Sequence, residues 1–192
     1  MGGNMVIGVL ALQGAFREHM KCLENIGVQG KLIKSNEDLE GIDGIIFPGG
    51  ESTAMGRILV DFNMKETISN KIKRGLPAWG TCAGMILLAK KINRTNKGHL
   101  EVMDIDVKRN AYGRQLGSFS TKEIIPLVSK DPIELVFIRA PYITKVGKNV
   151  EILCEIDGNI VAAKEENMLA TSFHPELTEY EDFHRYFIEM IK

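Results

Sequence analysis

Apolar residues in the first half of the chain fall into blocks that predict a strand followed by a helix. Residues Val6–Leu12 form a continuous run without charge, which is typical of a strand buried on both faces. From Phe16 to Ile26 the apolar residues recur at helical spacing, and Gly27 is placed to end that helix. Residues 31–33 form a further short candidate strand. The chain therefore begins with a strand–helix–strand pattern.

The same alternation continues to about residue 92. The next predicted elements are a strand at 44–47, a helix capped by Ser52 or Thr53 and running to Val60, a helix at 65–73, a strand at 76–80 and a helix at 83–92. Strands that alternate with helices are typical of a parallel sheet that is covered on both faces. We therefore expect an α/β fold with a mostly parallel central sheet.

After about residue 95 the pattern changes to short strands separated by turn residues. Residues 150–156 and 160–163 flank an Asp-Gly-Asn turn, and residues 168–173 form another apolar run. A final helix carries its apolar residues from Tyr180 to Ile191 on one stripe. We expect the C-terminal half to add antiparallel strands, and we expect residues 1–192 to form a single domain because no repeat or linker interrupts them.

Composition and charge exclude several classes of function. Apolar residues make up 44% of the 192 residues, which excludes a disordered chain, and the net charge of −1 gives no general attraction to nucleic acid. No apolar run approaches the roughly 20 residues needed to cross a bilayer, and the N-terminus lacks the pattern of a signal peptide. We therefore expect a cytoplasmic protein that binds neither membrane nor nucleic acid.

The three cysteines predict neither a disulfide framework nor a zinc site. Cys22, Cys82 and Cys154 are an odd number, lie far apart and include no CxxC pair. In a reducing compartment each is either a small buried apolar residue or a reactive thiol. We expect no metal and no cofactor. Which of the two roles each cysteine has depends on the sequence around it.

The strongest candidate for chemistry is Cys82, which lies in the segment Gly80-Thr81-Cys82-Ala83-Gly84. A nucleophile between a strand and a helix, with a small residue two positions away on either side, matches the pattern of a nucleophile elbow. The strained turn needs small neighbours because the helix passes close to the strand. Unpaired N–H groups at a helix N-terminus also favour a thiolate. A buried cysteine with accidental glycine neighbours is the alternative.

His174 is the best candidate for the base that such a thiol needs. It lies in the segment His174-Pro175-Glu176, where proline favours extended backbone, and residues i and i+2 of an extended chain project to the same side. Glu176 could therefore orient the imidazole and complete a Cys-His-Glu triad. His19 and His184 fall on amphipathic stripes and His99 in a polar turn, so we assign these three no role.

A glycine-rich loop, Pro48-Gly49-Gly50-Glu51-Ser52-Thr53, follows the strand at 44–47. Phosphate binding is the weaker interpretation because the Walker lysine is missing and a carboxylate stands where an anion would bind. In a hydrolase the loop could supply one backbone N–H donor to an oxyanion, from Gly50, with Ala83 supplying the second. The alternative is a tight turn without chemistry.

A small basic cluster surrounds Tyr112, formed by Lys108, Arg109 and Arg114. With the overall charge near zero, such a cluster is more typical of a solvated surface or of an arm that binds a small ligand than of a nucleic-acid site.

Together these motifs resemble the class I, or triad, glutamine amidotransferases, and within them the PdxT/SNO family of glutaminase subunits of pyridoxal 5′-phosphate synthases. The resemblance runs along the whole chain. Its segments are 8–14, Pro48 to Thr53, Gly80 to Gly84, Arg109 to Gln115 with Ser118-Phe119, Ile138 to Pro141, and Thr171 to Leu177. The departures are residues 98–102, which are more polar than expected and distant from the proposed site, and an extension of four residues at the start.

The resemblance implies a flavodoxin-like three-layer sandwich and hydrolysis of L-glutamine to L-glutamate and ammonia. Ammonia would pass through a tunnel to a PdxS/SNZ-type synthase subunit in a large hetero-oligomer, which makes pyridoxal phosphate from pentose and triose phosphates. Carried over by position, Cys82 is the nucleophile that forms a thioester, His174 the acid/base and Glu176 its partner. The implied glutamine contacts are Gly50, Glu51, Ser52, Arg109, Ile138 and Arg139.

The resemblance also implies that the isolated chain is nearly inactive until the partner docks and the Gly49–Gly50 peptide reorients. Two other functions stay open at this point. One is a stand-alone cysteine hydrolase or thiol-dependent stress protein on a similar sheet. The other is a non-catalytic subunit that only binds and regulates a partner.

Overall fold

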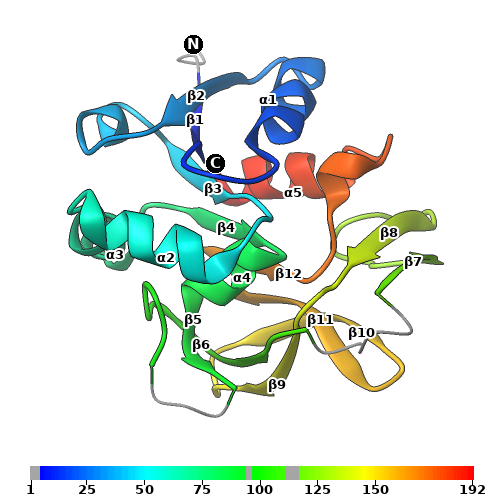
Figure 1. Ribbon diagram of the computed structural model, residues 1–192. Helices are drawn as coiled ribbons and strands as arrows, with labels where there is room; N and C mark the ends of the chain where they lie inside the picture. Colours follow the sequence, from blue (N-terminus) through cyan, green and yellow to red (C-terminus); the bar gives the residue numbers. More distant parts are fainter. Residues whose placement is uncertain (1–4, 94–96, 111–116) are drawn as a thin grey trace.

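Helices lie on both faces of one large sheet (Figure 1). The computed structural model describes residues 5–93, 97–110 and 117–192. Five strands at one side of the sheet run parallel to one another in the order β2-β1-β3-β4-β12. Their bounds are β1 Val6–Leu10, β2 Gln29–Ile33, β3 Gly44–Phe47, β4 Ala78–Thr81 and β12 Met168–Thr171.

Strands that follow α4 (Ala83–Leu88) in the chain continue the same sheet beyond β12, in the order β11-β9-β6-β5, and β10 pairs with β11. All these pairs are antiparallel except β5 with β6. A separate antiparallel pair is formed by β7 and β8. The bounds are β5 Ala89–Ile92, β6 Met103–Lys108, β7 Ser118–Glu123, β8 Ile133–Ile138, β9 Tyr142–Val146, β10 Glu151–Ile156 and β11 Asn159–Glu165.

The helices make the outer two layers of the sandwich. One face of the sheet carries α1 (Phe16–Asn25) and α5 (Asp182–Ile191), and the other carries α2 (Ser52–Asp61), α3 (Lys65–Lys73) and α4 (Ala83–Leu88). Two short 3₁₀ turns, η1 (Glu37–Leu39) and η2 (Pro175–Leu177), complete the elements. The predicted α/β sandwich with a mostly parallel sheet is therefore confirmed, whereas the single domain over 1–192 stays a prediction.

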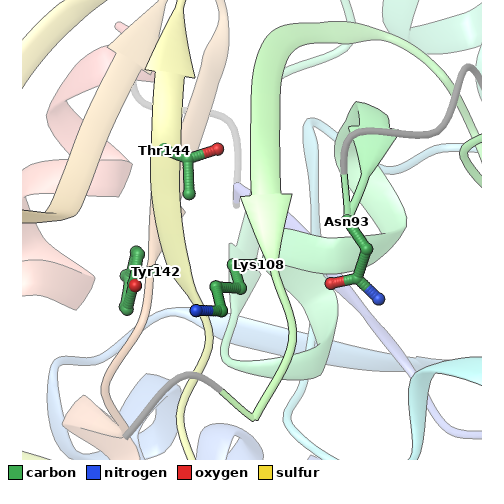
Figure 2. A pocket seen from close by; sticks show the side chains of 4 residues that line it. All are labelled: Asn93, Lys108, Tyr142 and Thr144. Carbon is green, nitrogen blue, oxygen red and sulfur yellow. The ribbon is translucent and has the colours of Figure 1, made fainter.

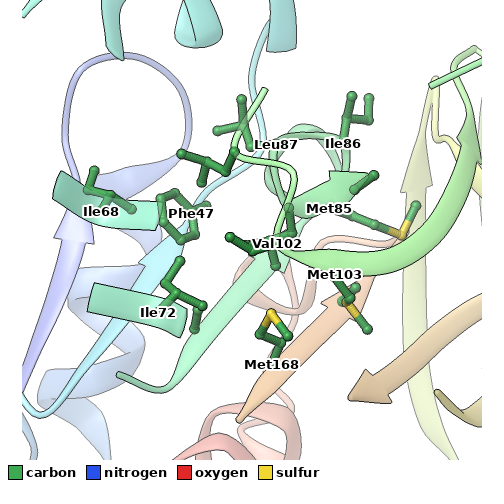
Figure 3. Close-up of a cluster of buried hydrophobic side chains, with 14 of the residues drawn as sticks. Phe47, Ile68, Ile72, Met85, Ile86, Leu87, Val102, Met103 and Met168 are labelled. Carbon is green, nitrogen blue, oxygen red and sulfur yellow. The ribbon is translucent and has the colours of Figure 1, made fainter. Parts of the chain in front are cut away.

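Strand residues alternate between two hydrophobic cores, as the period of a pleated strand requires. Ile46 and Trp79 point to the core beneath α1 and α5, while Phe47 and Ala78 point to the core beneath α2, α3 and α4. Figure 3 shows Phe47 in the second core, close to Ile68 and other apolar side chains. Because both faces are apolar, the central strands β3, β4 and β12 are buried throughout, whereas the edge strand β2 is largely half-buried.

The helix predicted at 83–92 is too long. It ends at Leu88, and the backbone of Ala89 turns to an extended conformation with φ −61° and ψ 137° to begin β5. Lys90 and Lys91 are both exposed, while Ala89 and Ile92 are buried. An irregularity in the pairing with β6, between Ala89 and Lys91, allows two consecutive lysines to face outward. The single apolar run concealed a helix followed at once by an edge strand.

Other differences concern the ends of elements. The first strand ends at Leu10 rather than Leu12, the strand of residues 31–33 begins at Gln29, and the strand before the elbow spans 78–81. The last strand ends at Thr171, and the final helix begins at Asp182, after Tyr180. None of the helices in the described ranges has the length and apolar character to cross a membrane.

Candidate active site

Cys82 lies in a strained turn between β4 and α4. Its backbone has φ 50° and ψ −105°, a conformation that residues with a side chain rarely adopt. A Cβ on Gly80 would collide with the backbone of Gly84, and a Cβ on Gly84 would collide with the carbonyl of Phe47. The two glycines are therefore required by close packing of α4 on β3 and β4, which is the physical reason expected for an elbow.

Pairing of β12 with β4 brings His174 to Cys82. The two strands are in parallel register, with Thr81 opposite Thr171, and the Cys82 N–H donates to the Thr171 carbonyl at 2.8 Å. His174 follows three residues after Thr171, and its interaction with the Cys82 side chain helps to raise its pKa. The sulfur also lies 3.9 Å from the carbonyl oxygen of Ile138. Residues far apart in the sequence thus meet at the carboxyl ends of adjacent strands.

Glu176 completes the group. Its Oε1 lies 2.7 Å from Nδ1 of His174, and both residues are buried. Burial by itself lowers the pKa of His174, but hydrogen bonds to Cys82 and Glu176 and the charge of Glu176 outweigh it and raise the pKa to about 10. The route to this contact differs from the expected one. Glu176 reaches the imidazole because His174 caps the 3₁₀ turn η2, and not because the segment is extended.

The glycine-rich loop packs against His174. A Cβ on Gly49 would overlap the His174 imidazole, so only glycine leaves room for the ring. The Gly49 carbonyl accepts a hydrogen bond from the Ala15 N–H at 3.0 Å, and Gly14, with φ 93°, allows this approach. The loop that follows β1 therefore supports the loop that follows β3.

Gln13 is a supporting residue that we did not single out. Its side-chain carbonyl accepts from the Glu51 N–H at 2.8 Å and so ties the two loops together. Gln13 belongs to the segment 8–14 that resembles the family, but a glutamine after a strand does not by itself predict a hydrogen bond to a distant loop.

Glu51 and Arg109 form an exposed ion pair at the edge of this loop. The carboxylate caps α2 by accepting from the N–H groups of Thr53 and Ala54, at 3.0 and 2.7 Å. These two hydrogen bonds, together with the nearby Arg109, lower the pKa of Glu51. Arg109 lies 3.3 Å from Glu51 and donates to the Thr53 hydroxyl at 3.0 Å. The helix N-terminus is thus already occupied by a carboxylate, which disfavours phosphate there.

The remaining residues singled out in the sequence lie near this loop and the elbow. Ala83 and Ser52 are the buried first residues of α4 and α2, and Gly50 precedes Glu51. Arg139 is exposed, has φ 43°, and follows Ile138 at the end of β8. The part of the Arg109–Gln115 motif at 111–116, including Tyr112 and Arg114, lies outside the described residues.

Beyond the end of β6, a pocket of about 430 Å³ opens next to Arg109 and is lined by Asn93, Lys108, Tyr142 and Thr144 (Figure 2). The Lys108 ammonium lies 5.8 Å from the centre of the Tyr142 ring. The Asn93 side chain accepts from the Arg109 N–H at 3.0 Å. Lys108 thus contacts Tyr142, whereas the Arg109 guanidinium contacts Glu51 and Thr53.

The other two cysteines are poor nucleophiles. Burial is the largest cause that raises the pKa of Cys22 and of Cys154, in each case to about 11. Both thiols are therefore protonated at neutral pH, and a thiol attacks only as thiolate. Cys82 differs from both in its surroundings, because it interacts with a histidine that is paired with a carboxylate.

The three histidines without an assigned role are buried or half-buried. His19 and His184 are fully buried, 2.9 Å apart, and His19 Nε2 lies 3.5 Å from Glu176 Oε2. His99 is half-buried with its ring against Gly56 of α2, and burial lowers its pKa. The neighbouring Leu100 is a core residue, so the segment 98–102 is less of a surface feature than its composition indicates.

Comparison with known proteins decides the family. The SNO glutamine amidotransferase family matches residues 9–192. The chain belongs to this family. Among its relatives is a pyridoxal 5′-phosphate synthase subunit PdxT of Clostridium botulinum (strain Loch Maree / Type A3), 60% identical over 184 residues, which are 95% of either chain. Another is a PdxT subunit of Ruminiclostridium cellulolyticum, 58% identical over 186 residues, 96% of this chain and 98% of the relative.

Solved structures show the same family fold. A crystal structure of a glutamine amidotransferase is 41% identical, covers 96% of this chain and 98% of that chain, and has a TM-score of 0.90. A structure of PurLQS from Thermotoga maritima is 15% identical with a TM-score of 0.71, over 99% of this chain and 100% of that chain. The second likeness concerns the fold alone.

Proposed function

We propose that this chain hydrolyses the side-chain amide of L-glutamine as the glutaminase subunit of a pyridoxal 5′-phosphate synthase. The observation that carries the proposal is the buried Cys82–His174–Glu176 group at the carboxyl ends of β4 and β12, in a member of a glutamine amidotransferase family. The PdxT names of relatives at 60% and 58% identity support the synthase as the complex it serves.

In this proposal the Cys82 thiolate attacks the amide carbon of glutamine. His174 is protonated at neutral pH and gives its proton to the leaving nitrogen, so that ammonia departs and a thioester forms. The neutral imidazole then takes a proton from water, which attacks the thioester and releases glutamate. Glu176 holds Nδ1–H of His174 throughout, which keeps Nε2 directed at the reacting atoms.

Two backbone N–H groups would stabilise the oxyanion, those of Ala83 and Gly50. Ala83 is the first residue of α4, where an N–H has no partner within the helix. The peptide before Gly50 is held in one orientation, because the Gly49 carbonyl accepts from Ala15 N–H. A reorientation of this peptide on partner docking would have to break that bond, at a net cost of about 1 kcal/mol. We expect the synthase subunit to offset this cost.

Glu51 and Arg109 would hold the amino-acid end of glutamine. A zwitterionic substrate needs a cation for its carboxylate and an acceptor for its ammonium, and this pair presents both charges beside the glycine-rich loop. Ser52, Ile138 and Arg139 are the further contacts that we propose.

Glutamate release from glutamine, measured with and without a synthase subunit, tests the proposal. We expect release with the synthase, little without it, and none from a Cys82→Ser complex. The matched control is Cys22→Ser, which removes a buried thiol outside the site and should keep full activity. Wild-type protein that releases no glutamate in the complex would refute the proposal.

The same assay separates the other two functions. Equal hydrolysis of glutamine and of simple amides would favour a stand-alone cysteine hydrolase. Glutamine-dependent product formation by the Cys82→Ser complex would favour a regulatory subunit. If ammonia supply is the only function lost, added ammonium salt should restore product formation by that complex.

A further inference from the structure

A buried pair of histidines lies directly behind the Cys82–His174–Glu176 group. His19 comes from α1 and His184 from α5, and neither exposes any surface. The Trp79 ring packs at right angles to both imidazoles. Polar side chains in such apolar surroundings seldom lack hydrogen-bond partners, so each ring nitrogen is expected to have one.

The contacts of three of the four ring nitrogens form a chain that ends on Glu176. His19 Nδ1 lies 2.9 Å from His184 Nε2. His19 Nε2 lies 3.2 Å from the Thr81 hydroxyl and 3.5 Å from Glu176 Oε2. Within the described part of the chain, Glu176 Oε2 and His184 Nδ1 are buried without a hydrogen-bond partner, so the 3.5 Å approach of His19 is the nearest donor contact of that carboxylate oxygen.

Both histidines are neutral at physiological pH. Burial is the main cause that lowers the pKa of His19 well below its ordinary value, and burial lowers the pKa of His184 to about 3. Each ring therefore carries one proton, and only one proton lies between the two rings. Two arrangements of these protons are possible.

In the first arrangement His19 carries its proton on Nδ1 and donates it to His184. The proton of His184 then lies on Nδ1, which has no acceptor, and the lone pair of His19 Nε2 accepts from the Thr81 hydroxyl while facing the carboxylate of Glu176. In the second arrangement His184 donates from Nε2 to His19, and His19 Nε2–H lies between the Thr81 hydroxyl oxygen at 3.2 Å and Glu176 Oε2 at 3.5 Å. The second arrangement leaves only one lone pair without a partner, which costs less than a buried N–H donor facing no acceptor and a carboxylate facing a lone pair.

We propose that His19 is a positioning residue for the reaction: held by His184, it donates its Nε2–H to Glu176 Oε2, while Oε1 of the same carboxylate takes the Nδ1–H of His174. The carboxylate is then held at two points. This inference rests on the proposed function, since it assigns a role in that site.

The position of Glu176 explains why its carboxylate needs a second hydrogen bond. The turn η2 that carries it has three residues, and its neighbour Leu177 is 45% exposed. So short an element fixes a side chain poorly by itself. A donor from α1, whose own position is set by the sheet, restrains the carboxylate plane and with it the imidazole. The 3.5 Å contact is longer than an ordinary hydrogen bond, and catalytic hydrogen bonds commonly tighten only when substrate is bound.

The kinetic test compares His19→Met, which removes both ring nitrogens, with His19→Gln. A glutamine amide offers one donor and one acceptor, the same two functions as the proposed state of His19. Glutaminase rates are measured in the complex with the synthase subunit. We expect His19→Met to lower kcat about 10- to 100-fold at an unchanged KM, the size of a lost hydrogen bond to a charged group. His19→Gln should recover most of kcat.

Leu23→Ala is the matched control, because it weakens the packing of α1 without removing the His19 imidazole. Leu23 is fully buried one turn further along α1, and its side chain belongs to the hydrophobic core beneath the helix. Its variant should be less stable yet keep the wild-type kcat at a temperature where all variants are folded. A His19→Met enzyme within twofold of wild type, a glutamine variant no better than the methionine variant, or an equal loss in Leu23→Ala would overturn the proposal.

A second measurement does not depend on activity or on new variants. The chain has four histidines, so ¹⁵N–¹H spectra of the wild-type rings can be assigned and read for the site of the proton. We expect His19 and His184 to be neutral and protonated on Nε2 across the neutral pH range. A proton on Nδ1 of His19 would overturn the proposal. If the wild-type complex released no glutamate, the proposed function would fail, while this spectrum would still report on the histidine pair.

Discussion

The backbone strain at Cys82 predicts that glycine at this position makes the protein more stable than alanine does. Both Cys82→Gly and Cys82→Ala remove the thiol, and they differ only in the Cβ. With φ 50° and ψ −105°, a residue with a Cβ is strained by about 1–3 kcal/mol. Glycine relieves that strain, but its freer unfolded chain costs about 0.4–1 kcal/mol.

The free energy of unfolding of Cys82→Gly should therefore exceed that of Cys82→Ala by about 1 kcal/mol. In a chain of 192 residues this corresponds to a Tm about 2–4 °C higher for Cys82→Gly than for Cys82→Ala. Thermal unfolding followed by circular dichroism, confirmed by urea titration, measures the difference directly. Neither variant should hydrolyse glutamine.

A matched pair at Asn70 gives the opposite sign. Asn70 is exposed in the interior of α3, where the backbone is an ordinary helix. There, Asn70→Gly should be less stable than Asn70→Ala by about 1 kcal/mol. If Cys82→Gly were no more stable than Cys82→Ala while the Asn70 pair behaved as expected, the elbow would store no strain and our explanation of the turn would be wrong.

Three further predictions concern the same region. Gly84→Ala should lower glutaminase activity at least about 10²-fold, because its Cβ meets the Phe47 carbonyl and displaces the elbow; wild-type rates would refute this. Glu51→Ala should lower the free energy of unfolding by about 1 kcal/mol through loss of the α2 cap, measured by urea titration. Folding raises the pKa of His174 to about 10, so protonated His174 stabilises the folded state. This contribution to the free energy of unfolding should be complete below pH 6.5 and disappear as the pH rises to about 10. In Glu176→Gln the free energy of unfolding should depend less on pH across this range.

Local patterns were enough to locate the strained turn at Cys82. The spacing of Gly80, Cys82 and Gly84 predicted a tight passage of a helix over a strand, and the structure shows contacts that no Cβ would fit. Such a pattern is informative because the constraint is local: a turn of five residues dictates its own small neighbours.

The helix predicted at 83–92 shows where local patterns fail. Apolar residues from Ala83 to Ile92 suit a buried helix and a buried strand equally well. Residues 89–92 form a strand because they pair with β6, and β6 is too far along the chain to be seen in a local sequence pattern. The extended chain assumed at His174 failed for a related reason, since the residues that follow it close a 3₁₀ turn.

The buried histidines show a further limit. A histidine on an amphipathic stripe has the same appearance in sequence whether it packs passively or contacts a buried carboxylate. His19 and Glu176 meet because α1 packs against η2 on one face of the sheet. No spacing in the chain encodes that meeting.

The sequence by itself determined the alternation of strands and helices, the turn at Cys82 and the types of residue available for chemistry, because each depends on neighbours within a few positions. The tertiary structure decided which of these residues meet. Only the parallel pairing of β12 beside β4 brings His174 to Cys82, and only the packing of α1 and α5 on one face places His19 against Glu176. Contacts of this kind depend on the order of strands in a sheet, which long-range packing sets and local propensity does not.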